Sequence, residues 1–306
     1  MRLFIFLLAI SAGFASCSED FFSQTLDIDP PEYEKQFVMH AFGTNRDSTF
    51  RISLTQNFGI LENVPDSAWA IPGATVKVLE EGQLKTTLSI SPDNRELYEA
   101  FVLPGFFQPG KTYELRASHP DLPTVTSRQI MPQPVAIDSV RFRPIAGING
   151  DGDRLSSFDV YLRDDAGVEN YYEVRVAVFY PIIEFYYDSL GNAVIDTVGY
   201  QDFTLEAVDS DDPNAQLTYG GGMAVSDRFF DGQSYKFAAR VYETSGYTYR
   251  VYVRAITKEF YLWSISAERK YNAEDNPLAE PVTTYTNLDT GIGAFGLAHE
   301  QIFDVE

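Results

Sequence analysis

The feature that most constrains the fold is a period of two in the placement of apolar residues. In short stretches, apolar side chains alternate with polar ones, and glycine or proline separates the stretches. Such alternation places the apolar side chains on one face of an extended strand, as in a half-buried β-strand. The clearest examples are Phe50–Leu54, Ala74–Val78, Tyr113–Ala117, Phe158–Leu162, Tyr172–Val178 and Tyr249–Ala255. Short strands with turn residues between them predict a mainly β, sandwich-like fold.

One segment departs from this pattern. Residues 257–271 read TKEFYLWSISAERKY, and Phe260, Trp263, Ala267 and Tyr271 recur at the spacing of one helical face. Thr257 is a residue type that caps helices. We therefore predict one short helix near the C-terminus, packed on a β-domain.

A proline-rich joint divides the strand patterns. Pro132 and Pro134 restrict the backbone between two sets of strands. With 44% hydrophobic residues, the chain can bury a sizeable core. We predict two tandem β-sandwich-like domains, namely residues 36–133, which are immunoglobulin-like, and residues 134–306, which include the helix near 257–271.

The N-terminal residues indicate export. Residues 1–16 combine a positive start, the apolar run LFIFLLAI and the small-residue stretch SAGFAS, which is typical of a secretory signal peptide. Cys17 follows directly and is the only cysteine, so no internal disulfide can form. The segment FASC resembles a bacterial lipobox, although Phe14 stands where leucine is usual. We expect lipidation of Cys17, for example with palmitate. The alternative is a chance cysteine beside a cleavage site.

The residues after Cys17 predict a location. Ser18, Glu19 and Asp20 resemble the export signal of lipoproteins on the outer face of the outer membrane. We expect residues 17–35 to form a lipidated, acidic tether. The predicted location is the outer membrane, with a lipid anchor and the protein facing the cell exterior.

Charge and motifs exclude several classes of function. The formal net charge of −21 does not suit nucleic-acid binding, which needs lysine and arginine against phosphates. Residues 291–296, GIGAFG, match a dinucleotide-binding fingerprint, but only ten residues follow Gly296, so the required helix and acidic residue have no place. We expect these glycines to serve a turn or strand edge where a side chain would clash. We predict neither a cofactor nor catalytic residues.

A short acidic segment allows two interpretations. Asn149, Asp151 and Asp153 alternate with glycines like the start of a calcium loop, but Arg154 and Val160 stand where glycine and glutamate are needed. A turn between strands accounts for the same residues. We assign no metal site, and the calcium question stays open.

Aromatic clusters provide the candidate contact residues. The stretch FYPIIEFYY includes Phe185 and Tyr186, Phe229 lies in another cluster, and the long segment 55–73 carries Phe58 and Trp69. Exposed aromatic side chains anchor partners or stack on sugars. The alternative, which we favour for these clusters, is that alternate residues face a sandwich core.

Several segments together resemble a known family. They are LDIDPPEYEKQFVMHAF, IPGATVKVLEEG, LPGFFQPGKTYELRAS, MPQPVAIDSV, EFYLWS and EPVTTYTNLDTGIGAFG. The chain resembles the bacterial outer-membrane lipoproteins catalogued as DUF4249. The resemblance implies an accessory lipoprotein of a TonB-dependent transporter and supplies no catalytic residues. We therefore expect a non-catalytic binding partner of such a transporter. The alternatives are a structural or adhesive surface protein and, less favoured, a surface hydrolase.

Overall fold

The computed structural model describes residues 32–305, apart from residues 60, 66, 67, 211, 245–247, 275, 277 and 278. The chain divides into two compact units. One comprises Lys35–Asn57 and Val64–Glu306 and contains every strand and the helix described below. In the other, the Tyr33 hydroxyl donates a hydrogen bond of 2.6 Å to the Glu62 carboxylate. The predicted signal peptide, Cys17 and the Ser18–Asp20 triplet lie outside the described residues.

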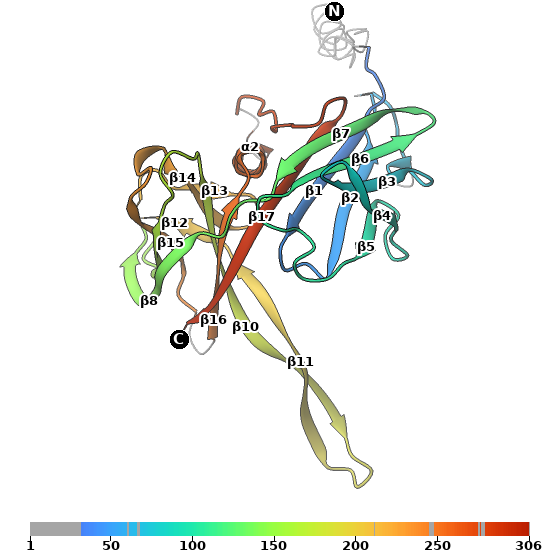
Figure 1. The fold of residues 1–306 in the computed structure, drawn as a ribbon. Coiled ribbons are helices and arrows are strands. Elements are labelled where there is room, and N and C mark those ends of the chain that lie inside the picture. The colour runs from blue at the N-terminus through green and yellow to red at the C-terminus, as the bar shows by residue number, and fades with distance from the viewer. Residues whose placement is uncertain are drawn as a thin grey trace, which may run out of the picture. The chain divides into compact units, whose positions relative to one another are not determined.

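The prediction of a mainly β fold with one helix near the C-terminus is confirmed (Figure 1). The strands are β1 (Phe37–Thr44), β2 (Thr49–Gln56), β3 (Thr75–Glu80), β4 (Gln83–Ile90), β5 (Leu97–Phe101), β6 (Thr112–His119), β7 (Leu122–Ile130), β8 (Ala136–Ile148), β9 (Arg154–Arg163), β10 (Tyr171–Tyr187), β11 (Ala193–Leu205), β12 (Ala207–Asp209), β13 (Gln216–Thr218), β14 (Gly222–Ser226), β15 (Ser234–Tyr242), β16 (Thr248–Ile256) and β17 (Ile292–Val305). A short 3₁₀ turn, η4 (Asp227–Phe229), precedes β15, and the helix α2 spans Lys258–Glu274.

The first seven strands surround one hydrophobic core. Hydrogen bonding runs in the order β17-β1-β2-β5-β4-β3-β6-β7, and only two residue pairs join β5 to β4. Side chains from β1, β2 and β5 meet those from β3, β4, β6 and β7 in a single core. This core includes Phe50, Ile52, Val76, Val78 and Leu115. The alternating residues of the sequence therefore face inward, as predicted.

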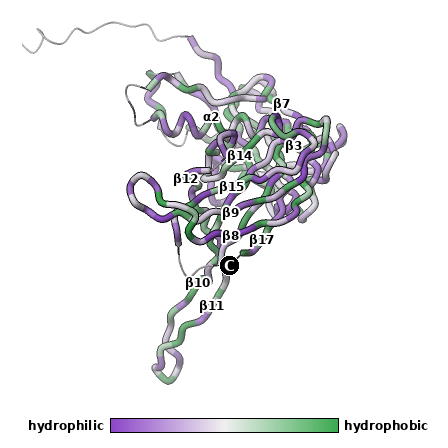
Figure 2. The backbone as a smooth tube through the Cα atoms, turned by 90° about the vertical axis from the view of Figure 1, so that its left-hand side faces the viewer, coloured by the Kyte–Doolittle hydropathy of each residue, from purple (hydrophilic) through white to green (hydrophobic). Residues whose placement is uncertain are grey.

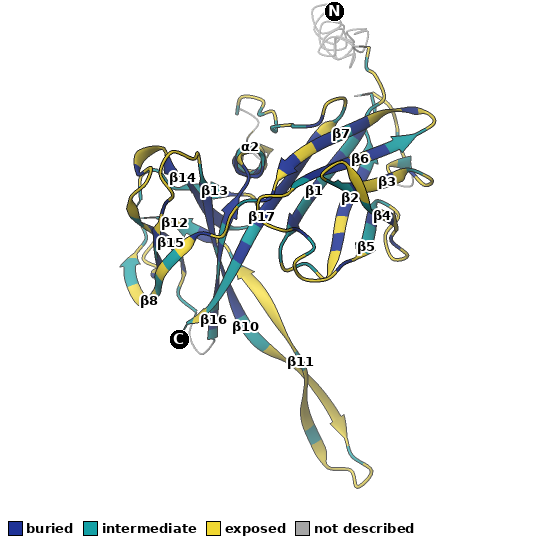
Figure 3. Ribbon diagram, viewed as in Figure 1, coloured by how far each residue is buried: buried dark blue, intermediate teal, exposed yellow. Residues whose placement is uncertain are grey.

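A second core lies between two sheets. The order of the four-stranded sheet is β12-β15-β9-β8. Its inward residues, such as Phe158 and Val160, share a core with Val174 of β10 and Val251 of β16. Figure 3 shows this buried part of β10 and β16 beside the exposed end of β10.

Strand β17 contributes to both cores. It pairs in parallel with β1 and antiparallel with β16. Phe295 and Leu297 belong to the first core, whereas Phe303 and Val305 pack against the second. The division at residues 133 and 134 stays a prediction, and β17 adds a physical link between the two parts.

The GIGAFG segment forms the start of this central strand. Gly293 has a φ of +113°, and a Cβ atom there would collide with the Met39 carbonyl oxygen of β1. A Cβ atom on Gly296 would lie 2.7 Å from the Phe260 Cβ of α2. The glycines therefore permit close packing, as expected, but Gly293 and Gly296 lie within a central strand and not at a turn or sheet edge.

Helix α2 begins where the sequence predicted. The Thr257 hydroxyl accepts a hydrogen bond of 3.4 Å from the Phe260 amide, as a capping residue does. Phe260 and Ala267 are buried, whereas Tyr271 is exposed. Among the described residues, no helix combines the length and apolar character needed to cross a membrane.

Candidate functional site: the β10–β11 arm

The end of β10 and most of β11 form a hairpin that extends beyond the rest of the sheet (Figure 1). β16 pairs with β10 only as far as Phe179, whereas β11 pairs with β10 up to Tyr187. We call residues 180–201 the arm. From Tyr180 to Tyr187 the arm reaches roughly 23 Å, at about 3.3 Å per residue.

The arm concentrates exposed apolar side chains. Figure 2 shows hydrophobic segments along both of its strands. Nine of the twenty-five large hydrophobic side chains that are exposed among the described residues belong to it: Ile182, Ile183, Phe185, Tyr186, Tyr187, Leu190, Ile195, Val198 and Tyr200. Leu190 at the tip is 84% exposed and Ile195 is 69% exposed. Clusters of this kind on a soluble domain mark interaction sites.

The favoured sequence interpretation of FYPIIEFYY is therefore wrong for Pro181–Tyr187, whereas Tyr180 packs against the second core. Alternate residues were expected to face a sandwich core, but Pro181–Tyr187 are all exposed. Phe185 and Tyr186, which were candidate contact residues, are 60% and 46% exposed. The core ends near Val178, because neither the second sheet nor β16 continues alongside the arm.

The pairing register gives the arm two different faces. Phe185 pairs with Ile195 and Tyr187 with Ala193, so these four side chains share one face with Ile183. The Phe185 and Tyr187 rings meet edge to face at 5.5 Å. Closer to the sheet, Tyr200 lies on the same side and stacks on Phe179 at 5.0 Å. We call the set Pro181, Ile183, Phe185, Tyr187, Ala193, Ile195 and Tyr200 the apolar face.

The opposite face of the arm carries charge. Glu184 pairs directly with Asp196, which places two carboxylates side by side across the strands. Like charges in this position destabilise a β-ribbon. Tyr186 and Val194 lie on this face as well, and a register shift between Ile182 and Ile183 adds a local irregularity.

A network of side chains fixes the base of the arm. Arg250 of β16 reaches Asp202 of β11 at 3.2 Å and Asp304 of β17 at 2.7 Å. Its guanidinium group lies over the Phe179 ring, 4.2 Å from the ring centre. The Tyr252 hydroxyl also donates a hydrogen bond to Asp202. These contacts tie β11 to strands on the far side of β10.

A buried ion network lies on the same sheet face as this base. Glu173, Arg254 and Glu300 are aligned across β10, β16 and β17. Arg254 bridges the two carboxylates at 3.2 Å and 2.5 Å, and Arg175 adds a second pair with Glu173 at 3.0 Å. Burial alone would raise the pKa of Glu173, but Arg175 and Arg254 lower it to about 2. A polar cavity of about 460 Å³ next to this network is lined by residues that include Thr204 and Tyr252.

The other predicted contact residues lie elsewhere. Phe229 is 66% exposed in η4, close to Ser226, which pairs with Tyr171 at the opposite end of β10 from the arm. Trp69 is 40% exposed, and Phe58 is half-buried. The structure therefore does not bring Phe229 together with Phe185.

Sequence reasoning missed the β11 half of the arm. Ile195, Val198 and Tyr200 were not among the candidate residues. The available signal was the turn-forming sequence DSLGN between FYPIIEFYY and AVIDTVGY, which indicates a long hairpin with apolar residues on both strands.

The acidic segment from Asn149 to Asp153 is explained by turn structure. The Asn149 side-chain oxygen accepts hydrogen bonds from the Asp151 and Asp153 amides, at 3.0 and 2.8 Å. This arrangement is an Asx-type turn, which needs no ion.

A second acidic group gathers three carboxylates. Oxygens of Asp164, Asp227 and Asp231 lie within 4.8 Å of one another. Each carboxylate accepts a hydrogen bond from a backbone amide, those of Gly232, Asn170 and Gly167 respectively. Burial raises the pKa of Asp227, and the neighbouring carboxylates Asp164 and Asp231 raise it further. These hydrogen bonds join the segments 164–170 and 227–232 to each other.

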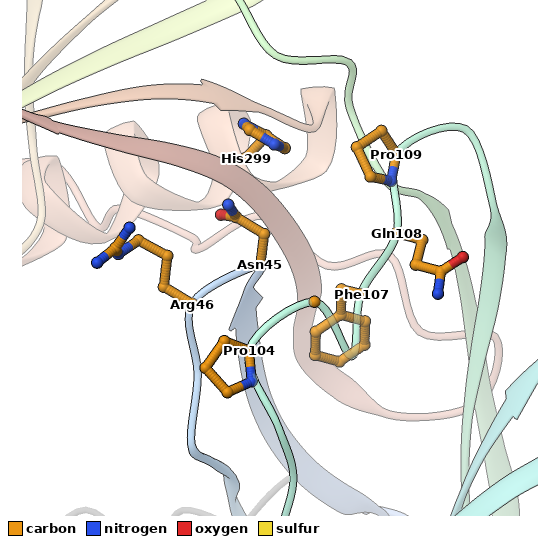
Figure 4. A pocket seen from close by; sticks show the side chains of 8 residues that line it. Asn45, Arg46, Pro104, Phe107, Gln108, Pro109 and His299 are labelled. Carbon is orange, nitrogen blue, oxygen red and sulfur yellow. The ribbon is translucent and has the colours of Figure 1, made fainter.

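A cavity of about 380 Å³ lies beside the turn between β1 and β2 (Figure 4). Asn45, Phe107 and His299 line it. The Asn45 side-chain oxygen accepts a hydrogen bond of 2.7 Å from the Glu300 backbone amide. Burial lowers the pKa of His299. Among the described residues that line the cavity there is no carboxylate to pair with this imidazole.

No curated protein matches this chain. Among solved structures, a DUF4785 family protein from Legionella pneumophila is 7% identical, with 72% of this chain and 52% of that chain covered and a TM-score of 0.22. A putative membrane anchored protein from Corynebacterium diphtheriae is 11% identical, with 87% and 60% covered and a TM-score of 0.21. A tetra-tandem repeat in the extending region of a large adhesion protein is 13% identical, with 89% and 75% covered and a TM-score of 0.20.

Scores this low carry no functional argument, and the chain spans 52% and 60% of the first two proteins. The family model gives a different result, because the one described as "Domain of unknown function (DUF4249)" matches residues 23–302. The match covers nearly the whole chain, so the chain belongs to the DUF4249 family.

Proposed function

We propose that this chain is a surface-exposed outer-membrane lipoprotein that acts as a non-catalytic accessory partner of a TonB-dependent transporter, and that the arm makes the contact. The observation that carries the proposal is the arm itself. It presents nine large apolar side chains to solvent on a hairpin whose base is fixed by Arg250.

A fixed base favours binding. An arm whose base is tied to the sheet loses less conformational entropy when it meets a partner than a loop that must fold. Aromatic and branched apolar side chains are also the usual anchors of protein interfaces. Phe185, Tyr187 and Ile195 are side chains of this kind, and they lie on the arm.

The location rests on the sequence. The signal peptide, Cys17 and the acidic triplet Ser18–Asp20 support a lipid anchor on the outer membrane. A protein held there meets barrel proteins of the same membrane at high effective concentration.

Site-specific photocrosslinking in the bacterium that encodes the chain tests this proposal. A photoreactive phenylalanine analogue replaces Tyr187 in the full-length protein, and a matched control replaces Tyr242, which is 49% exposed in the four-stranded sheet. We expect ultraviolet light to join Tyr187, and not Tyr242, to a TonB-dependent transporter. A protein that is accessible at the surface but forms no such adduct from the arm contradicts the proposal and favours a structural or adhesive role.

A further inference from the structure

We propose that the apolar face of the arm docks into an elongated apolar groove, rimmed by lysine or arginine side chains, on the partner protein. This inference rests on the proposed function and specifies the chemistry of the partner. It follows from the shape of the arm, from the exposure of one face and from the placement of charge.

Among the described residues, no layer covers the apolar face, whose side chains are exposed. A two-stranded hairpin is marginally stable in water unless a third layer buries its apolar side. Ile183, Phe185 and Tyr187 on β10 and Ile195 on β11 form a continuous strip without a charged residue. The length of the arm requires a groove of roughly 20 Å or more.

The opposite face carries acidic charge, and it would lie at the mouth of such a groove, level with the rim, once the apolar face is docked. The arm carries Glu184, Asp188 and Asp196, and it contains no lysine, arginine or histidine. Residues 176–227 as a whole contain no basic residue. Among the described residues, no basic side chain forms an ion pair with Glu184 or Asp196. A partner that supplies basic groups at the rim would offset the repulsion between these two carboxylates.

The same charges argue against two other occupants. A second copy of the chain would bring arms with identical acidic groups together, on molecules that each carry a formal charge of −21. An anionic lipid surface would repel Glu184, Asp188 and Asp196 in the same way. A basic rim fits the arm better than either.

The acidic pair of Glu184 and Asp196 also has a simpler explanation, and the experiment must distinguish it from binding to a basic rim. Charged residues on an exposed ribbon prevent it from pairing with other strands. In that case charge protects the free protein and contributes nothing to binding, so its neutralisation leaves binding unchanged.

The test uses the full-length protein in its own bacterium. Photoreactive phenylalanine is placed at Phe185 or Ile195 on the apolar face, or at Tyr186 on the opposite face. Each is combined with the native acids, with Glu184→Gln and Asp196→Asn, or with Glu184→Lys and Asp196→Lys. Adduct yield is then measured in isolated outer membranes at low and high salt, and crosslinked peptides are identified by mass spectrometry.

We expect Phe185 and Ile195 to give one protein adduct, at sites flanked by lysine or arginine, and Tyr186 to give much less. We expect the neutral pair to lower the yield several-fold and the lysine pair to lower it on the order of tenfold or more. Because the rim charges are partly exposed, we also expect the yield to fall as salt rises. An unchanged melting temperature in each variant shows that the fold is intact.

Other outcomes overturn the inference in distinguishable ways. An equal yield of the same transporter adduct from all three charge forms would support the proposed function but contradict a basic rim on the groove. Adducts of the chain with itself identify a second copy, and adducts with lipid identify the membrane. If Phe185, Ile195 and Tyr186 form no adduct with a transporter in any form, both the inference and the proposed function fail.

Discussion

Arg250 and Asp202 form an ion pair of 3.2 Å that joins β16 to β11 across the intervening strand β10. The pair lies at the point where the arm leaves the sheet, and the same guanidinium group also binds Asp304 and covers the Phe179 ring. One side chain therefore connects the arm to two strands of the main sheet. The base of the arm is therefore held by the main sheet, unlike the ends of a surface loop that has no such contacts.

Replacement of Arg250 tests this connection. Arg250→Ala removes both ion pairs and the contact with Phe179, so local opening of the arm costs less free energy. Because Arg250 and Asp202 are partly exposed, we expect a loss of about 1 kcal/mol, or roughly five- to tenfold faster amide hydrogen exchange in β11. Arg51→Ala breaks a surface pair with Glu99 between β2 and β5 and is the matched control. Equal exchange of the arm amides in wild type and Arg250→Ala contradicts this role.

The buried network predicts a pH dependence of stability. The folded-state pKa of Glu173, about 2, lies below the roughly 4.3 of an unfolded glutamate. A lowered folded-state pKa contributes stability that is present above the unfolded value and is lost as the pH falls through the folded value. Glu173→Gln should therefore reduce the free energy of unfolding by roughly 3 kcal/mol at pH 7.

The difference between wild type and Glu173→Gln should shrink as the pH falls from about 4.3 toward about 2. Urea unfolding at a series of pH values measures it. Glu99→Gln, at the exposed pair with Arg51, should change stability by less than about 1 kcal/mol throughout. A difference for Glu173→Gln that stays constant between pH 6 and pH 3 would argue against the network as described.

The contact between β1 and β17 predicts a second stability effect. Gly293 has positive φ, and a Cβ atom there meets the Met39 carbonyl. Gly293→Ala should lower the free energy of unfolding by about 3 kcal/mol or more, because it adds backbone strain and forces the two strands apart. Gly147→Ala, where no atom lies within 4 Å of the added Cβ, should cost less than about 1 kcal/mol. Similar unfolding curves for the two variants would show that the close approach is not needed.

The anchor is tested by replacing the only cysteine. Cells grown with a labelled palmitate analogue should incorporate it into the wild-type protein and not into Cys17→Ala. The variant should also keep its signal peptide or leave the membrane fraction. A Cys17→Ala protein that has normal mature size and stays bound to the membrane refutes the lipid anchor.

Local patterns in the sequence predict the strands and the helix well. Phe50, Ile52 and Leu54 alternate in the sequence and are buried in the structure, and Thr257 caps α2. These features depend on residues that are neighbours in the chain. The parallel pairing of β1 with β17 could not be found in this way, because it joins segments about 250 residues apart.

The arm shows why alternation alone is ambiguous. Val174 and Val176 are buried, whereas Ile183 and Phe185 further along the same strand are exposed. Both parts have a similar apolar composition, since a strand face built to meet a partner resembles one built to meet the core. Only the extent of β16 and of the four-stranded sheet decides where burial ends, and the residues of β10 themselves do not record that extent.

Shortening the arm tests directly whether it makes the contact with the transporter. Residues 182–199 are replaced by Asn-Gly, a two-residue turn suited to joining Pro181 to its partner Tyr200. The protein is then isolated from its own outer membranes under mild detergent, beside wild type. We predict that the shortened protein keeps its melting temperature within a few degrees and its surface exposure, but no longer co-purifies with a TonB-dependent transporter. A shortened protein that retains the same transporter in equal amount would show that the arm does not make this contact.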